Sequence, residues 1–218
     1  MKETTVHIPV GNAVLEGDLA IPPKSQGIVI FAHGSGSSRF SSRNKYVAEY
    51  LQREGFATLL FDLLTPEEER IDNYNMEYRF NIKLLTVRLS GATLWITKHA
   101  PASKLAVGYF GASTGAAAAL AAENDHHGTV KAVVSRGGRP DLAGGALPQV
   151  LAPTLFIVGG EDHQVLDLNE QAMAKMRAVK ELSIVPGATH LFEEPGALKT
   201  VSGLALGWFQ QYLKAGKS

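Results

Sequence analysis

The sequence contains no cysteine among its 218 residues. Its absence excludes disulfide bonds, thiolate metal sites and a cysteine nucleophile. No apolar run approaches the length of a membrane span, and residues 1–7 lack the hydrophobic core of a signal peptide. We therefore expect a cytoplasmic protein without a membrane partner.

The sequence also lacks an excess of charge of either sign. Lysine and arginine number 21, aspartate and glutamate also number 21, and the formal net charge is zero. A basic excess is the electrostatic signature of nucleic-acid binding, so we expect no nucleic-acid partner. Neither a His-x-x-x-His pattern nor a cluster of carboxylates is present, so we expect no metal and no cofactor.

The length and the hydrophobic content of 45% fit a single domain over residues 1–218. Apolar runs predict strands at residues 6–10, 13–21, 28–32, 57–61, 105–110, 130–135, 154–158 and 182–185. Helices are expected at residues 43–54, 77–99, 116–122, 166–176 and 198–213, a polar excursion at 65–75 and a loop at 136–149. Strands alternating with helices predict an α/β fold, a doubly wound and mostly parallel sheet with helices on both faces. The first two strands are expected to form an antiparallel pair at one edge.

The segment Gly111-Ala112-Ser113-Thr114-Gly115 lies between an expected strand and an alanine-rich helix. A serine between two glycines on a strand-to-helix turn is typical of the nucleophile of serine hydrolases. The turn is so tight that side chains at Gly111 and Gly115 are expected to collide with the neighbouring strand and helix. We therefore predict Ser113 as the nucleophile.

A serine nucleophile needs a base, and seven histidines are available. Three of them, His33, His163 and His190, follow expected strands at the carboxyl edge of the sheet, where the sites of α/β proteins form. His190 lies just beyond the last strand, where a loop can reach Ser113, so we predict it as the base. His33 is interpreted as a residue that organises its own loop, and His163 as a residue that points away from the site.

The base needs an acid that holds its tautomer. Asp162 follows the strand at residues 154–158 and is the favoured candidate, although aspartate at such a position is often only a helix N-cap. Glu161 and Asp141 are weaker alternatives.

The chain order Ser113, Asp162, His190 is that of the α/β-hydrolase fold. Over residues 33–192 the sequence resembles the small α/β-hydrolases of the dienelactone-hydrolase-like group. The run at residues 135–141 also resembles hydrolase domains that occur beside phosphoribosyltransferase domains. Dienelactone hydrolases use a cysteine nucleophile where this chain has Ser113, which argues against dienelactone itself as the substrate.

The resemblance implies an oxyanion hole made by backbone N–H groups. Thr114, the residue after the nucleophile, provides one donor, and Ser35 in the loop after the strand at 28–32 provides the second, with Gly36 as an alternative. Acyl transfer requires such donors for the oxyanion that develops on the substrate.

Residues 136–153 are too few for the large cap that many lipases place there, and residues 65–79 are the only other candidate cover. We expect an open, shallow site without a large cap. Arg136 and Arg139 are predicted near it, where either could anchor an anionic group of the substrate. The alternative for both is a salt bridge to Asp141 or Asp62.

The sequence thus predicts a serine carboxylesterase of the EC 3.1.1 class that cleaves small or exposed esters through an acyl-enzyme on Ser113. A thioesterase or acyltransferase with the same triad remains open, as does a non-catalytic binding protein on a hydrolase fold. The expected partner is a small-molecule ester, and the chain is expected to be a monomer or a homodimer.

Overall fold

The computed structural model describes residues 3–99 and 101–213. In this part of the chain eight strands form one sheet in the order β1-β2-β4-β3-β5-β6-β7-β8. Strand β2 pairs antiparallel with both β1 and β4, and the six strands from β4 to β8 pair with one another in parallel. The bounds are β1 Glu3–Val10, β2 Ala13–Ala20, β3 Ile28–Ala32, β4 Ala57–Phe61, β5 Val107–Ala112, β6 Val130–Arg136, β7 Thr154–Gly159 and β8 Lys180–Val185.

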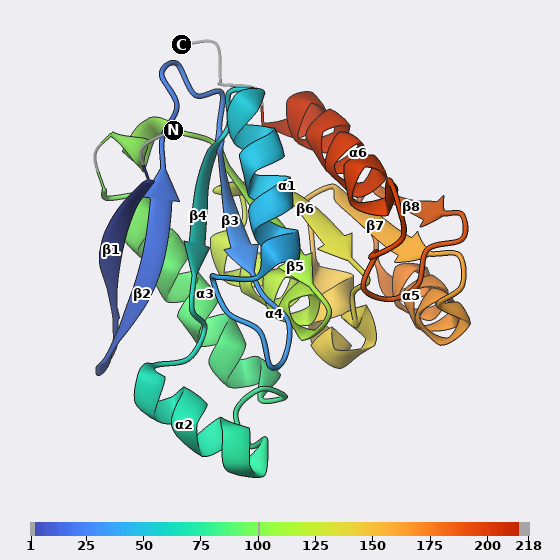
Figure 1. Ribbon diagram of the computed structural model, residues 1–218, viewed down its shortest axis with the longest axis horizontal. Helices are drawn as coiled ribbons and strands as arrows, with labels where there is room; N and C mark the ends of the chain where they lie inside the picture. Colours follow the sequence, from blue (N-terminus) through green and yellow to red (C-terminus); the bar gives the residue numbers. More distant parts are fainter. Residues whose placement is uncertain (1–2, 100, 214–218) are drawn as a thin grey trace.

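Helices cover both faces of the sheet (Figure 1). Helices α1 and α6 pack together on one face, and α3 packs against α4 on the other. Helix α2 lies beyond the carboxyl ends of the parallel strands, at the bottom of Figure 1. The bounds are α1 Ser42–Arg53, α2 Pro66–Asn75, α3 Ile82–Ile96, α4 Thr114–Glu123, α5 His163–Lys175 and α6 Ala197–Tyr212, with 3₁₀ segments η1 Ala102–Lys104, η2 Asn124–His126 and η3 Pro140–Gln149.

The doubly wound sheet and all eight expected strands are confirmed, with ends shifted by a few residues. Three sequence expectations were wrong. Residues 65–75 contain helix α2, because Thr65 and Glu68 form a capping box that satisfies the amide groups of its first turn. The helix expected from residue 77 begins at Ile82, because the amides of Tyr78 and Arg79 donate to the Asp72 carboxylate instead. The loop expected at 136–149 includes the 3₁₀ segment η3.

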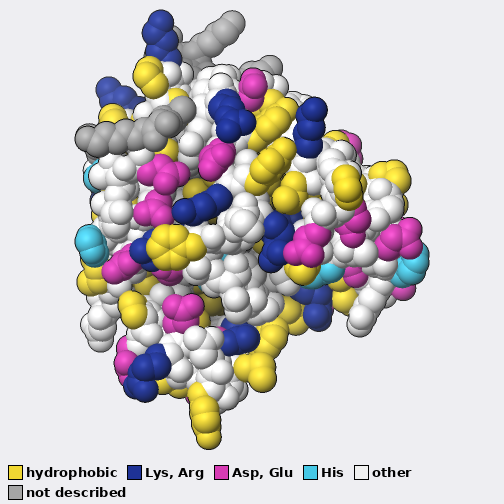
Figure 2. Space-filling model, in the orientation of Figure 1, with side chains coloured by type: hydrophobic (Ala, Val, Ile, Leu, Met, Phe, Trp, Pro, Cys, Tyr) yellow, Lys and Arg dark blue, Asp and Glu magenta, His cyan; other side chains and the backbone are white. Residues whose placement is uncertain are grey.

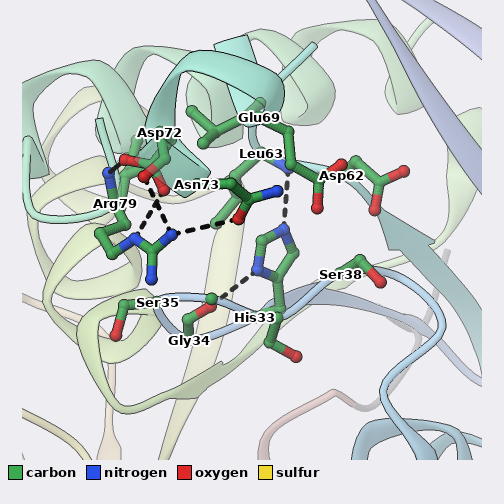
Figure 3. Close-up of a pocket in the computed structure, with 14 residues that line it drawn as sticks. His33, Gly34, Ser35, Ser38, Asp62, Leu63, Glu69, Asp72, Asn73 and Arg79 are labelled. Carbon is green, nitrogen blue, oxygen red and sulfur yellow. Dashed lines mark hydrogen bonds and ion pairs between the residues drawn. The ribbon is translucent and has the colours of Figure 1, made fainter. Parts of the chain in front are cut away.

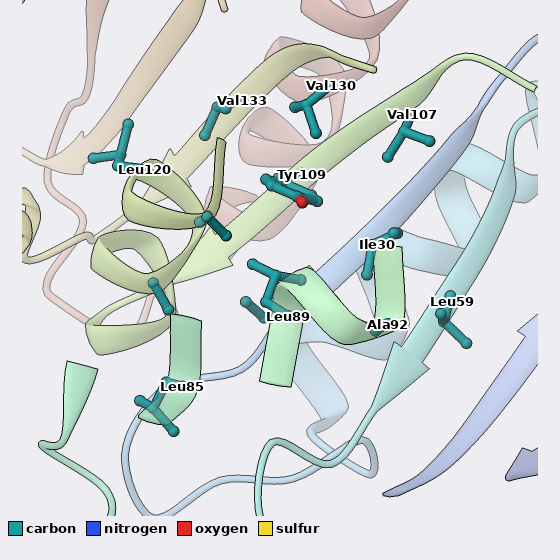
Figure 4. Close-up of a cluster of buried hydrophobic side chains, with 14 of the residues drawn as sticks. Ile30, Leu59, Leu85, Leu89, Ala92, Val107, Tyr109, Leu120, Val130 and Val133 are labelled. Atoms are coloured by element: carbon teal, nitrogen blue, oxygen red, sulfur yellow. The ribbon is translucent and has the colours of Figure 1, made fainter. Parts of the chain in front are cut away.

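The apolar core has two parts, one on each face of the sheet. Figure 4 shows part of the larger one, in which Leu89 and Ala92 of α3 lie next to Tyr109 and Ile30 of the central strands. The Tyr109 hydroxyl is buried but bonded to Thr93 Oγ1 at 2.6 Å, so it carries no unsatisfied polar group into the core. Burial on both faces explains why the central strands read as continuous apolar runs.

Positive and negative side chains are interspersed over the face of the molecule shown in Figure 2. In the described residues, no helix is both long and apolar enough to cross a bilayer.

Candidate active site

Ser113 lies at the turn between β5 and α4, with φ 51° and ψ −120°. A side chain at positive φ is strained, and such strain concentrates at functional sites. A Cβ on Gly111 would come within 2.5 Å of Ala116 Cα, and a Cβ on Gly115 within 2.2 Å of the Ala32 carbonyl oxygen. Gly111 and Gly115 are therefore required because strand and helix approach closely, as the sequence predicted. Ser113 is the one residue with a side chain on this turn that has a positive φ.

His190 and Asp162 meet at the carboxyl edge of the sheet. Asp162 follows β7 and His190 follows β8, and the distance between His190 Nδ1 and Asp162 Oδ2 is 2.6 Å. Asp162 is the residue before α5, but its side chain makes no capping bond to that helix. The carboxylate is thus directed to the imidazole instead of the helix, and it fixes the proton on Nδ1 so that Nε2 is left as the basic nitrogen.

The loop that carries His190 is held at several points. The amide and the hydroxyl of Thr189 both donate to Glu194 Oε1, at 3.0 and 2.5 Å. The hydrogen bond from the Thr189 hydroxyl lowers the pKa of Glu194. Phe192 is fully buried at φ 57°. These contacts orient the loop before any ligand binds.

Ser113 and His190 line one cavity, together with Ser35, Arg43, Asn44 and Arg136. The structure gives no hydrogen bond between Ser113 Oγ and the imidazole. In proteins without a bound substrate such contacts are often long and tighten when the substrate binds. The cavity therefore brings together the predicted nucleophile and base, with the acid behind the base.

The two predicted oxyanion donors lie on either side of the same turn. Thr114 is the first residue of α4, so its N–H has no acceptor within the helix. Ser35 lines the cavity, and the adjacent Gly34 is so close to Ser113 that a Cβ there would lie 3.1 Å from the serine Cβ. Backbone N–H groups at these positions are suited to bind an oxyanion on Ser113.

His33 organises the loop that contains Ser35, as predicted. Its Nε2 accepts from the Leu63 amide at 3.0 Å, and its Nδ1 donates to the Gly34 carbonyl at 2.9 Å (Figure 3). Burial lowers the pKa of His33. Since Nε2 accepts a hydrogen bond, His33 is a neutral structural residue and not a base.

A second cavity lies on the other side of this loop, between it and α2 (Figure 3). Asp72 is 2% exposed, and its carboxylate accepts a hydrogen bond from Arg79 Nε at 2.6 Å. Burial acts to raise the pKa of Asp72, but the hydrogen bonds from Arg79 outweigh burial and lower this pKa. The Arg79 guanidinium lies against Gly36: a Cβ there would be 3.2 Å from its Nη1. The contact between Arg79 and Gly36 was not predicted from the sequence. The only sign of it there was that residues 65–79 were a candidate cover for the site.

The two arginines have different roles. Arg139 makes a bidentate salt bridge to Asp141, with both N–O distances at 2.8 Å. A salt bridge of this kind was the alternative to substrate binding for Arg139. Arg136 is 5% exposed and makes no such pair; its Nη2 donates to Asn44 Oδ1 at 3.1 Å. Burial, with a smaller contribution from Arg43, lowers the pKa of Arg136 to about 10. Within the described residues no group of three or more metal-ligating side chains occurs.

Comparisons with known proteins identify the family and the fold. The sequence profile of the dienelactone hydrolase family matches residues 15–211. Two Mycobacterium tuberculosis proteins, provisionally named phosphoribosyl transferases, are 55% identical over 213 residues, which cover 98% of this chain. The chain spans only 47% of their length.

Solved structures show the same fold. A dienelactone hydrolase from Anabaena variabilis superposes with a TM-score of 0.96 at 57% identity, covering 98% of this chain and 99% of that one. The protein Est1E from Butyrivibrio proteoclasticus superposes with a TM-score of 0.79 at 14% identity, covering 95% and 98%, which shows likeness of fold alone. The chain belongs to the dienelactone hydrolase family and has its hydrolase fold, with no large cap.

Proposed function

We propose that this hydrolase cleaves carboxylic esters of small or exposed substrates through an acyl-enzyme on Ser113. The observation that carries the proposal is the 2.6 Å contact between Asp162 and His190, whose imidazole lines the same cavity as the strained Ser113. A base that is oriented by a carboxylate and lines the same cavity as a serine is the arrangement needed for nucleophilic catalysis.

The first half of the reaction transfers the acyl group to the enzyme. Ser113 Oγ attacks the ester carbonyl while His190 Nε2 takes the hydroxyl proton, and Asp162 stabilises the resulting imidazolium. The N–H groups of Thr114 and Ser35 bind the oxyanion. When the tetrahedral intermediate collapses, the C–O bond to the alcohol breaks and His190 returns its proton to the departing oxygen.

The second half releases the acyl group. Water gives a proton to His190 and attacks the acyl-enzyme, and the same N–H groups bind the second oxyanion. Collapse breaks the bond to Ser113 Oγ, which regains its proton from His190, and the carboxylic acid leaves. A thiol leaving group or an alcohol acceptor would need the same residues, so thioester hydrolysis and acyl transfer are variants of one mechanism.

The transferase name of the mycobacterial relatives belongs to proteins about twice as long as this chain. The dienelactone hydrolase profile spans almost all of the present chain. We therefore assign hydrolysis, not phosphoribosyl transfer, to the part that the relatives share with it.

A short series of 4-nitrophenyl esters, offered to the wild type and to Ser113→Ala, tests the proposal. We expect turnover by the wild type and near-background rates in the variant, with the preferred chain length measuring the acyl pocket. A fluorophosphonate probe should label Ser113. If the probe fails to label it and neither protein turns over any ester, the chain is a binding protein on a hydrolase fold.

A further inference from the structure

Arg136 is a buried guanidinium without a counter-ion. It ends β6, is 5% exposed, and takes part in none of the ion pairs of the described residues. Its guanidinium donates to the Asn44 side-chain oxygen at 3.1 Å and lies over the ring of Phe192, whose centroid is 5.8 Å from Cζ. Its Nε has no hydrogen-bond partner among the residues that the structure describes. A buried charge left without a compensating charge is costly, and a perturbed charged group that lines a cleft is a candidate for a functional site.

The neighbouring charge increases this cost. Arg43 lines the same cavity, and its positive charge helps to lower the pKa of Arg136. Arg43 itself is paired at 3.0 Å with Glu193, whose side chain is 66% exposed, so this carboxylate lies toward solvent and is not the missing partner of Arg136. The wall of the cavity therefore holds two guanidinium groups and no carboxylate side chain.

The rest of this wall also consists of groups that suit an anion. Ser35, Ser37 and Ser41 line it, together with Asn44 in the first turn of the twelve-residue helix α1. Hydroxyl groups and the positive end of a helix dipole favour negative charge. Each alone is common on protein surfaces, but here they surround a buried arginine whose Nε has no partner.

We propose that Arg136, assisted by Arg43, binds a compact oxyanion, a carboxylate or a phosphate, that is carried by the ester attacked by Ser113. The proposal rests on the proposed function and names its substrate class, which is anionic esters. The same cavity wall carries Ser113 and His190, so an anion held there lies close to the reacting carbonyl. Arg139 cannot take this role because its guanidinium is already paired with the Asp141 carboxylate.

Matched ester pairs test the proposal. On the acyl side, 4-nitrophenyl hemisuccinate and 4-nitrophenyl 3-phosphonopropanoate are compared with 4-nitrophenyl butyrate. On the alcohol side, 3-acetoxypropanoate and 2-acetoxyethyl phosphate are compared with propyl acetate. We expect the wild type to prefer an anionic member, and the ratio of kcat/KM for anionic over neutral ester to fall about 10- to 100-fold in Arg136→Met, the range for a charge-assisted hydrogen bond. Which member is preferred distinguishes carboxylate from phosphate.

Arg139→Met is the control, since it removes a nearby guanidinium that is already paired with Asp141. Its ratio should stay at the wild-type value. If Arg136→Met leaves the ratio of kcat/KM for anionic over neutral ester unchanged in every pair, the proposal is overturned. Loss of a purely structural arginine would slow the hydrolysis of both esters alike.

A binding measurement separates this proposal from the proposed function. Calorimetric titration of Ser113→Ala with succinate and with inorganic phosphate should show saturable binding to one of them, lost in Ser113→Ala/Arg136→Met. If the wild type hydrolyses none of the esters, the proposed function fails, and this titration alone decides whether the anion site exists. If neutral esters are hydrolysed but no anion binds and no anionic ester is preferred, the anion site fails and the esterase stands.

Arg136→Met could fail to fold, because Arg136 is buried between Asn44 and Phe192. In that case, measurements on the wild-type protein alone test the proposal. Competitive inhibition of butyrate ester hydrolysis by succinate or phosphate, together with a preference for an anionic ester, supports the site. Absence of both overturns it.

Discussion

Asp162 and His190, 28 residues apart in the chain, meet at 2.6 Å between carboxylate oxygen and Nδ1. The contact exists because β7 and β8 are parallel neighbours, so the loops that follow them emerge at the same edge of the sheet. The Asp162 side chain is 14% exposed and that of His190 39% exposed, so the imidazole is held from its buried side while its other nitrogen is free to act.

Replacement of Asp162 by asparagine should leave the fold intact but lose the carboxylate that fixes the His190 tautomer. We expect kcat for a neutral 4-nitrophenyl ester to fall about 10³- to 10⁴-fold, the scale known for the aspartate of such triads. Asp141→Asn is the matched control, because Asp141 pairs with Arg139 and not with a histidine. Equal losses in the two variants would remove Asp162 from the mechanism.

Gly115→Ala should prevent the close approach of α4 to β3, since the new Cβ would lie 2.2 Å from the Ala32 carbonyl oxygen. We expect the free energy of unfolding in urea to fall by about 3 kcal/mol, the upper part of the range for overpacking. Gly203→Ala in α6 meets no atom within 4 Å and should stabilise the protein by about 0.5–1 kcal/mol. A Gly115→Ala protein as stable as the wild type would contradict the close packing of this turn.

His33 should make stability depend on pH. Burial lowers its pKa below the ordinary histidine value of about 6.5, so below that pH the unfolded chain binds a proton that the folded protein excludes. The free energy of unfolding should therefore decrease as pH falls from about 6.5, by at most about 1.4 kcal/mol per pH unit, and this slope should be smaller in His33→Gln. His126, whose pKa burial also lowers, is present in both proteins and cancels in the comparison. Parallel unfolding curves between pH 7.5 and 5 would show that His33 is not responsible.

Arg79 should act as a positioning residue for the loop that holds Ser35. It is fixed by Asp72 and Asn73 (Figure 3). Its guanidinium also lies against Gly36. Arg79→Met should lower kcat about tenfold with little change in KM, because a displaced oxyanion donor weakens binding of the transition state more than that of the substrate.

The matched control for Arg79 is Arg70→Met. Arg70 is 71% exposed and pairs with Glu67 on the surface of α2, so its removal should change neither constant. If Arg79→Met raises KM alone, the residue contacts substrate instead of supporting the loop.

Local sequence determined much of this protein. Gly111, Ser113 and Gly115 fix the turn by their size, and apolar runs fix the central strands because both faces of the sheet are buried. The order of strands and helices then implies which loops share an edge. These are short-range properties, so the sheet, the turn and the positions of Asp162 and His190 were predictable from residues near each other in the chain.

Only the tertiary structure decided what each charged side chain meets. Arg136 and Arg139 belong to one glycine-rich stretch of the sequence and look alike there, but Arg139 faces Asp141 while Arg136 is buried against Asn44, 92 residues away. Helix α2 was also missed, because its acidic, polar residues carry little apolar periodicity and its start depends on a capping box. Contacts between distant segments arise from packing, which a linear pattern of residue types does not encode.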